Sequence, residues 1–135
     1  MTAPVIDCSA AAAWVLADEH SESADAALDA VVAHGAVAPA LLWFEFRTVL
    51  LRAERLGRIE PGETELALSL FDDLRIRLDR VPRGDEVMRL ARTHGLTAYD
   101  AAYLELALRD GCPLATLDRR LARSAEAAGV ETIGP

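Results

Sequence analysis

Hydrophobic and polar residues follow two different spacings along this chain. Short apolar runs occupy residues 4–6, 36–38 and 113–117, and weaker ones lie within 75–81 and 130–133. Between these runs, apolar residues recur every three or four positions over longer segments. That spacing is typical of helices that bury one side. The pattern therefore predicts short buried strands separated by amphipathic helices.

The helices are expected at about residues 9–17, 21–33, 39–56, 63–74, 84–93, 97–107 and 119–128. His34-Gly35 suits a helix end, and Pro39 is expected in the first turn of the long third helix. Strands that alternate with helices favour an α/β fold, here a three-layer α/β/α sandwich around a mostly parallel sheet. At 135 residues, we expect one domain over residues 1–135.

Four acidic residues fall at strand ends or in the early turns of helices. Asp7 and Asp118 follow predicted strands, whereas Glu45 and Asp100 stand near the beginnings of predicted helices. In open parallel sheets, ligands bind beyond the carboxyl ends of the strands. We therefore expect the four carboxylates to converge at one edge of the sheet.

Three of these positions also have purely structural explanations. Thr97-x-x-Asp100 fits a capping box, and an acid in a first turn is favoured by the helix dipole. Asp118 suits the N-cap of the helix that follows it, and either Asp7 or Ser9 suits the N-cap of the first helix. Each position, taken alone, is explained by capping.

Glu45 is harder to explain as a surface residue. Its helical neighbours three and four positions away include Leu41, Leu42 and Val49. Burying a lone carboxylate is unfavourable, so the position calls for a cation or a hydrogen-bond donor. An ion pair with Arg52 is the structural alternative.

The charge of the chain narrows the chemistry. A formal net charge of -8 argues against a protein that coats nucleic acid with a basic surface. Two carboxylates 4 to 5 Å apart repel by roughly 3 to 4 kcal/mol at an effective dielectric of about 20, and a bound divalent cation removes that repulsion. Oxygen ligands favour Mg²⁺ or Mn²⁺. The three histidines, His20, His34 and His94, stand at helix ends without the spacing of metal ligands.

Other chemistries lack the residues they require. The chain has no lysine, which excludes Schiff-base mechanisms. Cys8 follows a predicted strand and Cys112 precedes one, so they are expected at opposite ends of the sheet, too far apart for a disulfide. No window approaches the roughly 20 apolar residues of a membrane span, and no basic leader is evident. We expect a cytoplasmic protein.

The acidic residues sit in segments that resemble the PIN-domain ribonucleases, particularly the VapC-like toxins of bacterial toxin–antitoxin pairs. The similarity extends almost from end to end, and four motifs occur in the family's order. They are Val5-Ile6-Asp7-x-Ser9, the Pro39-Ala40-Leu41 lead into Glu45, Thr97-x-x-Asp100-Ala-x-Tyr103, and Ala115-Thr116-Leu117-Asp118-Arg-Arg-Leu121. Thr48 departs from the pattern, because many relatives carry Asn there.

The resemblance implies a Mg²⁺-dependent endoribonuclease, with Mn²⁺ as a substitute, that cleaves RNA through an activated water. It implies metal ligation by Asp7, Asp100 and Asp118, with Glu45 acting directly or through a water. Ser9 and Thr116 are expected to support the site. It further implies a homodimer and a cognate antitoxin protein. The arginines just past Asp118 are candidate RNA contacts, namely Arg119, Arg120 and Arg123.

Two alternatives stay open at this point. One is a non-catalytic PIN-like module that binds RNA or protein, which the full set of four acids argues against. The other is a flavodoxin-like or nucleotide-binding domain. The first strand is followed by Asp7-Cys-Ser-Ala-Ala instead of a glycine-rich phosphate loop, which disfavours that interpretation.

Overall fold

The computed structural model describes residues 2–135, and its centre is a five-stranded parallel sheet. The strand order is β3-β2-β1-β4-β5. The strands are β1 (Val5–Ile6), β2 (Ala36–Pro39), β3 (Ile76–Asp79), β4 (Leu114–Ala115) and β5 (Thr132–Ile133). The predicted α/β fold is confirmed, and every strand pairing among residues 2–135 is parallel.

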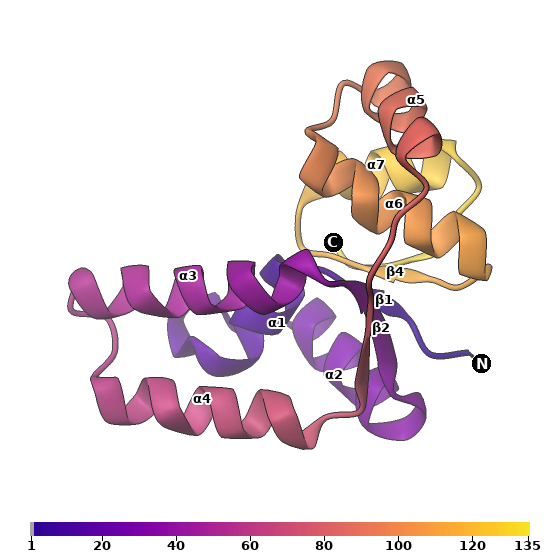
Figure 1. Cartoon of the computed structure of the whole chain (residues 1–135). Helices are drawn as coiled ribbons and strands as arrows, with labels where there is room; N and C mark the ends of the chain where they lie inside the picture. Colours follow the sequence, from indigo (N-terminus) through magenta and orange to yellow (C-terminus); the bar gives the residue numbers. More distant parts are fainter. Residues whose placement is uncertain (1) are drawn as a thin grey trace.

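Helices cover both sides of this sheet (Figure 1). One side carries α1 (Cys8–Val15), α2 (Glu22–His34), α3 (Leu41–Arg55) and α4 (Pro61–Asp73), and the 3₁₀ turn η1 (Ala17–Glu19) follows α1. The other side carries α5 (Gly84–His94), α6 (Ala98–Asp110) and α7 (Arg119–Ala127). This arrangement follows from right-handed crossovers, because the chain changes direction across the sheet after β3.

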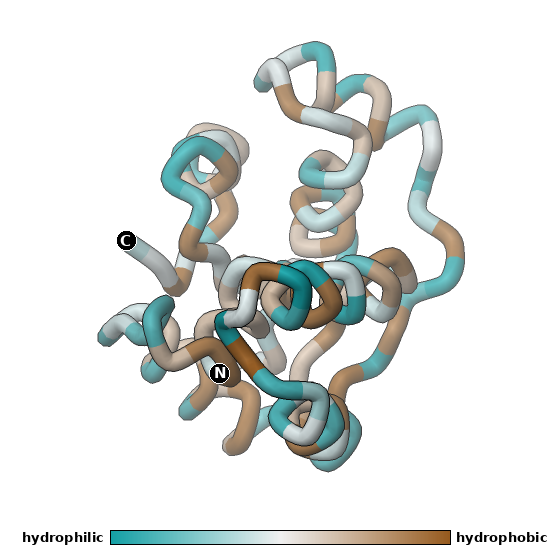
Figure 2. The backbone as a smooth tube through the Cα atoms, turned by 90° about the vertical axis from the view of Figure 1, so that its left-hand side faces the viewer, coloured by the Kyte–Doolittle hydropathy of each residue, from teal (hydrophilic) through white to brown (hydrophobic). Residues whose placement is uncertain are grey.

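The core lies between the sheet and these two helical layers. Val5, Ile6 and Leu114 are fully buried, as expected for central strands covered on both faces. In Figure 2, hydrophobic and hydrophilic segments alternate around the helical turns, so each helix has a side that can be buried. None of the helices among residues 2–135 is both long and apolar enough to cross a membrane.

One local prediction was wrong. Pro39 is the last residue of β2 and pairs in register with Asp79, rather than lying in the first turn of α3. The backbone N–H of Ala40 donates to the Asp79 carbonyl oxygen instead. Proline at the end of a strand removes no needed donor, and α3 begins two residues later.

The strand order places the reversal of the chain between β1 and β4. The sheet grows from β1 through β2 to β3 in one direction, and then from β4 to β5 on the other side of β1. Connections leave β1 and β4 toward opposite faces, which opens a crevice at their carboxyl ends. Asp7 follows β1 and Thr116 follows β4 at this point.

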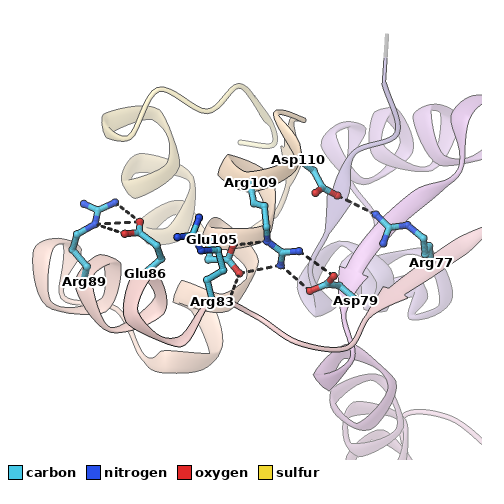
Figure 3. Close-up of polar contacts among 8 residues, drawn as sticks. All are labelled: Arg77, Asp79, Arg83, Glu86, Arg89, Glu105, Arg109 and Asp110. Atoms are coloured by element: carbon cyan, nitrogen blue, oxygen red, sulfur yellow. Dashed lines mark hydrogen bonds and ion pairs between the residues drawn. The ribbon is translucent and has the colours of Figure 1, made fainter.

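An ionic network ties α6 to the end of β3 (Figure 3). The Arg109 guanidinium lies between the Glu105 and Asp79 carboxylates, with Nε 2.8 Å from Glu105 Oε2 and Nη2 2.8 Å from Asp79 Oδ2. The backbone N–H of Arg83 also donates to Glu105. Glu105 is 2% exposed, so its carboxylate depends on these donors.

We therefore expect the Arg109→Leu substitution to lower the free energy of unfolding by about 3 kcal/mol, because it leaves a buried carboxylate without its cation. Urea unfolding measures this change. The matched control is Arg77→Leu, which breaks the exposed Arg77–Asp110 pair and should change the free energy by less than about 1 kcal/mol. Equal effects of the two substitutions would contradict the proposed importance of burial.

Candidate active site

Asp7 is the buried centre of the candidate site. It is 6% exposed and forms the N-cap of α1, where its Oδ1 accepts from the Ala10 backbone N–H at 3.0 Å. The Ser9 hydroxyl donates to the same oxygen at 2.7 Å, and the Thr116 hydroxyl donates to Oδ2 at 2.5 Å. Both oxygens of the carboxylate are therefore held in fixed positions by the protein.

The loop after β4 is attached to Asp7 through Ser9 and Thr116. The Ser9 Oγ accepts from the Leu117 N–H at 2.9 Å, and the Thr116 Oγ1 accepts from the Asp118 N–H at 3.0 Å. Strand β5 supports this loop from the other side, since the Thr116 N–H donates to the Ile133 carbonyl oxygen at 3.1 Å. Two hydroxyl groups thus link the first strand of the chain to a loop more than 100 residues later.

Residue 134 must be glycine for this packing to hold. A Cβ atom on Gly134 would lie 2.3 Å from the Thr116 carbonyl oxygen, well inside van der Waals contact. The close approach of the two backbones keeps β5 beside Thr116. A glycine in the C-terminal segment therefore helps to position the support for Asp7.

Glu45 meets a donor that the sequence patterns did not identify. The Tyr103 hydroxyl of α6 donates to Glu45 Oε1 at 2.6 Å, and Tyr103 itself is 2% exposed. The structural alternative, an ion pair with Arg52, is not formed among residues 2–135. The hydrogen bond joins α3 and α6, which come from opposite faces of the sheet.

Asp100 and Asp118 occupy the helix starts that the sequence indicated. Thr97 is the N-cap of α6 and its hydroxyl accepts from the Asp100 N–H at 3.1 Å. Asp118 is the N-cap of α7, where its Oδ1 accepts from the Arg120 and Leu121 backbone N–H groups. Asp100 is half-buried and Asp118 is exposed. Asp118 therefore caps a helix with its side chain, whereas the cap of α6 is supplied by Thr97 and not by the Asp100 carboxylate.

The carboxylates influence one another electrostatically. Burial raises the pKa of Asp7, and the nearby charge of Asp100 raises it further, against the lowering effect of the Ser9 and Thr116 hydroxyls. Burial and then the charge of Asp118 raise the pKa of Asp100. The pKa of Glu45 is raised by burial and by Asp100 and Asp7, although Tyr103 opposes this. Negative charge is therefore concentrated here, and within residues 2–135 the Arg120 charge offsets only part of its effect on Asp100.

Cys8 lies beside these acids but is not a nucleophile. Burial and the charges of Glu45 and Asp7 raise the pKa of its thiol to about 12, so the thiolate is negligible near neutral pH. Both Cys8 and Cys112 are free thiols. The candidate chemistry belongs to the carboxylates.

The donor set fits an oxygen-preferring cation in its chemistry, but the side chains are not gathered into a ready-made cage. No three His, Cys, Asp or Glu side chains within residues 2–135 are close enough together to hold a metal ion. At least one carboxylate oxygen already accepts a hydrogen bond from a protein donor in each of Asp7, Glu45 and Asp118. Carboxylate oxygens are what Mg²⁺ and Mn²⁺ bind, and zinc would call for His or Cys.

The predicted arginines differ in their surroundings. The Arg120 guanidinium donates to the Gly95 carbonyl oxygen, which ties α7 to the turn before α6, and its charge lowers the pKa of Asp100. Arg119 and Arg123 are exposed and form no ion pair within residues 2–135. Arg120 is thus partly committed to structure, whereas the other two are available to a ligand.

The sequence reasoning overlooked Tyr103 as part of the site. Tyr103 stands three residues after Asp100 and therefore on the same side of α6. This spacing was a usable signal. What no pattern showed was that the neighbouring side of α3 carries Glu45 to within hydrogen-bonding distance.

The all-parallel sheet, with helices on both faces and acids near its strand-order reversal, places the chain in the α/β class, whose sites lie beyond the carboxyl ends of the strands. The PIN domain family model matches residues 5–127. The chain belongs to the PIN-domain family and is a VapC-like nuclease. The resemblance inferred from the motifs is confirmed, and the flavodoxin-like alternative is wrong.

Individual relatives come from Pyrobaculum aerophilum. The chain is 36% identical to Ribonuclease VapC3 over 126 residues, which cover 87% of this chain and 91% of the relative. It is 36% identical to Exonuclease VapC9 over 92 residues, or 67% of this chain and 68% of that protein. The crystal structure of PAE2754 superimposes with a TM-score of 0.74 at 26% identity, covering 98% of this chain and 91% of the other.

The raised pKa of Asp100 predicts that its charge destabilises the metal-free protein at neutral pH. We expect Asp100→Asn to raise the free energy of unfolding at pH 7 in EDTA, by no more than about 1 kcal/mol because solvent screens the half-exposed group. A carboxyl whose pKa is raised on folding destabilises above that pKa, and the effect disappears as the pH falls toward the ordinary value of 3.8. The difference between the two proteins should therefore shrink from pH 7 to about pH 4.

Urea unfolding at both pH values measures this difference. The control is Asp72→Asn, which changes an exposed carboxyl on α4. If Asp100→Asn is instead less stable than the wild type at pH 7, Asp100 acts mainly as a helix-start residue and not as a member of a repelling cluster.

Proposed function

We propose that this chain is a Mg²⁺-dependent endoribonuclease and the toxin of a toxin–antitoxin pair. The observation that carries the proposal is the set of four acids, Asp7, Glu45, Asp100 and Asp118, at the reversal of the strand order. Burial and mutual repulsion raise the pKa values of three of them, which is the electrostatic signature of a site built for positive charge. The names of the VapC relatives support RNA as the substrate.

The residues divide into ligands and supports. Asp7, Asp100 and Asp118 are the proposed Mg²⁺ ligands, directly or through water, and Mn²⁺ is expected to substitute. Asp7 is already fixed by Ser9 and Thr116. Asp118, which is exposed, and Asp100, which is half-buried, are the side chains free to turn toward it. Bound Mg²⁺ supplies Lewis acidity and lowers the pKa of a coordinated water.

Glu45 is proposed to position the attacking water, either directly or at a second ion. One of its oxygens accepts from Tyr103, and the other has no hydrogen-bond donor within residues 2–135. Its raised pKa suits a group that takes a proton from water during attack on the phosphorus. Water, having given one proton to Glu45, then forms the new P–O bond while the bond to the ribose oxygen breaks and that oxygen takes up a proton from solvent. No protein nucleophile is needed.

Two protein partners belong to the same proposal. A homodimer is expected, and light scattering of the pure protein at micromolar concentration should return twice the 14.5 kDa chain mass. A monomer would contradict it. The cognate antitoxin is expected to cover the acidic residues of the site with its own basic side chains. An antitoxin that binds tightly yet leaves RNA cleavage unchanged would contradict that role.

Metal binding tests the site without knowledge of the RNA target. Mn²⁺ at about 100 times its dissociation constant should stabilise the wild type by about 2.7 kcal/mol, measured as a rise in Tm. Asp100→Asn should gain much less, because the variant lacks one anionic ligand. Asp72→Asn, which alters a remote carboxyl, should gain as much as the wild type.

Cleavage of a responsive RNA provides the second readout. With Mg²⁺, Asp100→Asn and Asp7→Asn should each lower the rate at least a hundredfold, while EDTA should abolish it in the wild type. Full metal-dependent cleavage by Asp100→Asn would overturn the assignment. A wild type that binds RNA but neither gains stability from Mn²⁺ nor cleaves would instead favour a non-catalytic module.

A further inference from the structure

A groove beside the acidic residues is lined mostly by side chains that have no role in the proposed chemistry. It has a volume of about 750 Å³ and lies between α1, α3 and the start of α6. Its lining includes Ser9, Leu41, Phe44, Glu45, Arg52 and Tyr99. Because Glu45 and Ser9 belong to the candidate site, whatever occupies the groove lies next to the reacting atoms.

The exposed aromatic residues of the chain are all close to these acids in sequence. The chain has two Trp, two Tyr and three Phe. Among them, only Trp43, Phe44 and Tyr99 are exposed, by 41%, 67% and 65%. Phe44 directly precedes Glu45, and Tyr99 directly precedes Asp100. Phe44 and Tyr99, which line the groove, therefore come from α3 and α6, the helices that carry Glu45 and Asp100.

The fold does not need these rings to be where they are. The buried face of α3 consists of Leu42, Phe46, Leu50 and Ala53, and Phe44 lies outside it. An exposed Phe contributes little to stability, and clustered exposed aromatics mark binding surfaces. The Phe44 ring is nevertheless held in place, since it packs edge-on against Trp43 at 4.9 Å between centroids. Arg47 in turn covers the Trp43 ring at 3.6 Å.

The charge of the protein makes stacking the more useful form of attraction. At a net charge of -8, long-range attraction of phosphates is weak. Stacking of a nucleobase on an aromatic ring does not depend on net charge, and every base has a face that can stack. The guanidinium of Arg52, which forms no ion pair within residues 2–135, is the cation at this groove.

We propose that the groove binds an unpaired nucleotide of the RNA substrate, with its base stacked on Phe44 and Tyr99 and a neighbouring phosphate on Arg52. The inference rests on the proposed ribonuclease function and assigns the positioning of the nucleotide beside the cleaved bond to two aromatic side chains. A base inside a duplex is stacked on its neighbours and cannot enter such a groove. Phe44 and Tyr99 are thus substrate-positioning residues.

Fluorescence titration with a short unpaired RNA that contains 2-aminopurine tests the proposal, because the fluorescence of this base falls when it stacks. The titration is done in EDTA, so that binding is measured without hydrolysis. We expect quenching with the wild type, and a roughly tenfold higher Kd with Phe44→Ala and with Tyr99→Ala. Tyr99→Phe keeps the ring and should bind like the wild type.

The matched control is Leu66→Ala, which removes a 72% exposed apolar side chain on α4, away from the groove, and should leave the Kd unchanged. Annealing the RNA to its complement should also abolish quenching. Wild-type Kd values in both Phe44→Ala and Tyr99→Ala would overturn the proposal, as would the absence of quenching with the wild type. If the same substitutions leave the Kd for RNA unchanged but abolish antitoxin binding, the groove is a protein-binding site and the proposal is wrong.

The ribonuclease function is tested separately by the Asp100→Asn measurements. Suppose that Asp100→Asn loses Mn²⁺ stabilisation and cleavage, while the two alanine variants bind RNA like the wild type. This result would contradict only the proposal that the groove stacks a base. RNA binding that depends on Phe44 and Tyr99, without any metal-dependent cleavage, would instead contradict the proposed ribonuclease function. It would still support base binding in the groove.

Discussion

The structure depends on one buried carboxylate at the reversal of the strand order. Asp7 ends the first strand, begins the first helix and accepts hydrogen bonds from Ser9, Thr116 and the Ala10 backbone. Because Thr116 and Ser9 also hold the loop after β4, the same bonds fix the position of Asp118. Burying a lone acid is unfavourable, but these hydrogen bonds compensate the Asp7 carboxylate. They also join two segments that are distant in the sequence.

Much of the architecture was predictable because local signals and the global fold agree. Apolar runs, helical spacing and the caps at Asp7, Thr97 and Asp118 all indicate a parallel α/β sheet, and the four acids were found from strand ends and early helical turns. Pro39 was misplaced because a proline suits both the end of a strand and the start of a helix. The hydrogen bond between Tyr103 and Glu45 could not be predicted from the sequence, because it depends on how helices from opposite faces of the sheet approach each other.

Acidic and aromatic side chains have different proposed roles at the carboxyl edge of the sheet. Burial raises the pKa values of Asp7, Glu45 and Asp100, and the charges of neighbouring carboxylates raise them further. A bound cation is the simplest way to offset both effects. An acidic protein still has to attract a polyanion. Exposed rings that directly precede Glu45 and Asp100 offer contact with bases where charge offers little. Metal for the phosphate and stacking for the base are complementary solutions to the same electrostatic problem.

The most direct test of the central claim is the position of a metal ion in a crystal. Crystals soaked in Mn²⁺ and measured at its absorption edge reveal the ion by anomalous scattering. We expect a peak bound by oxygens of Asp7, Asp100 and Asp118, with the Asp118 side chain turned away from its capping position. Saturating Mn²⁺ that gives no peak at these residues, or a peak only elsewhere on the protein, would contradict it.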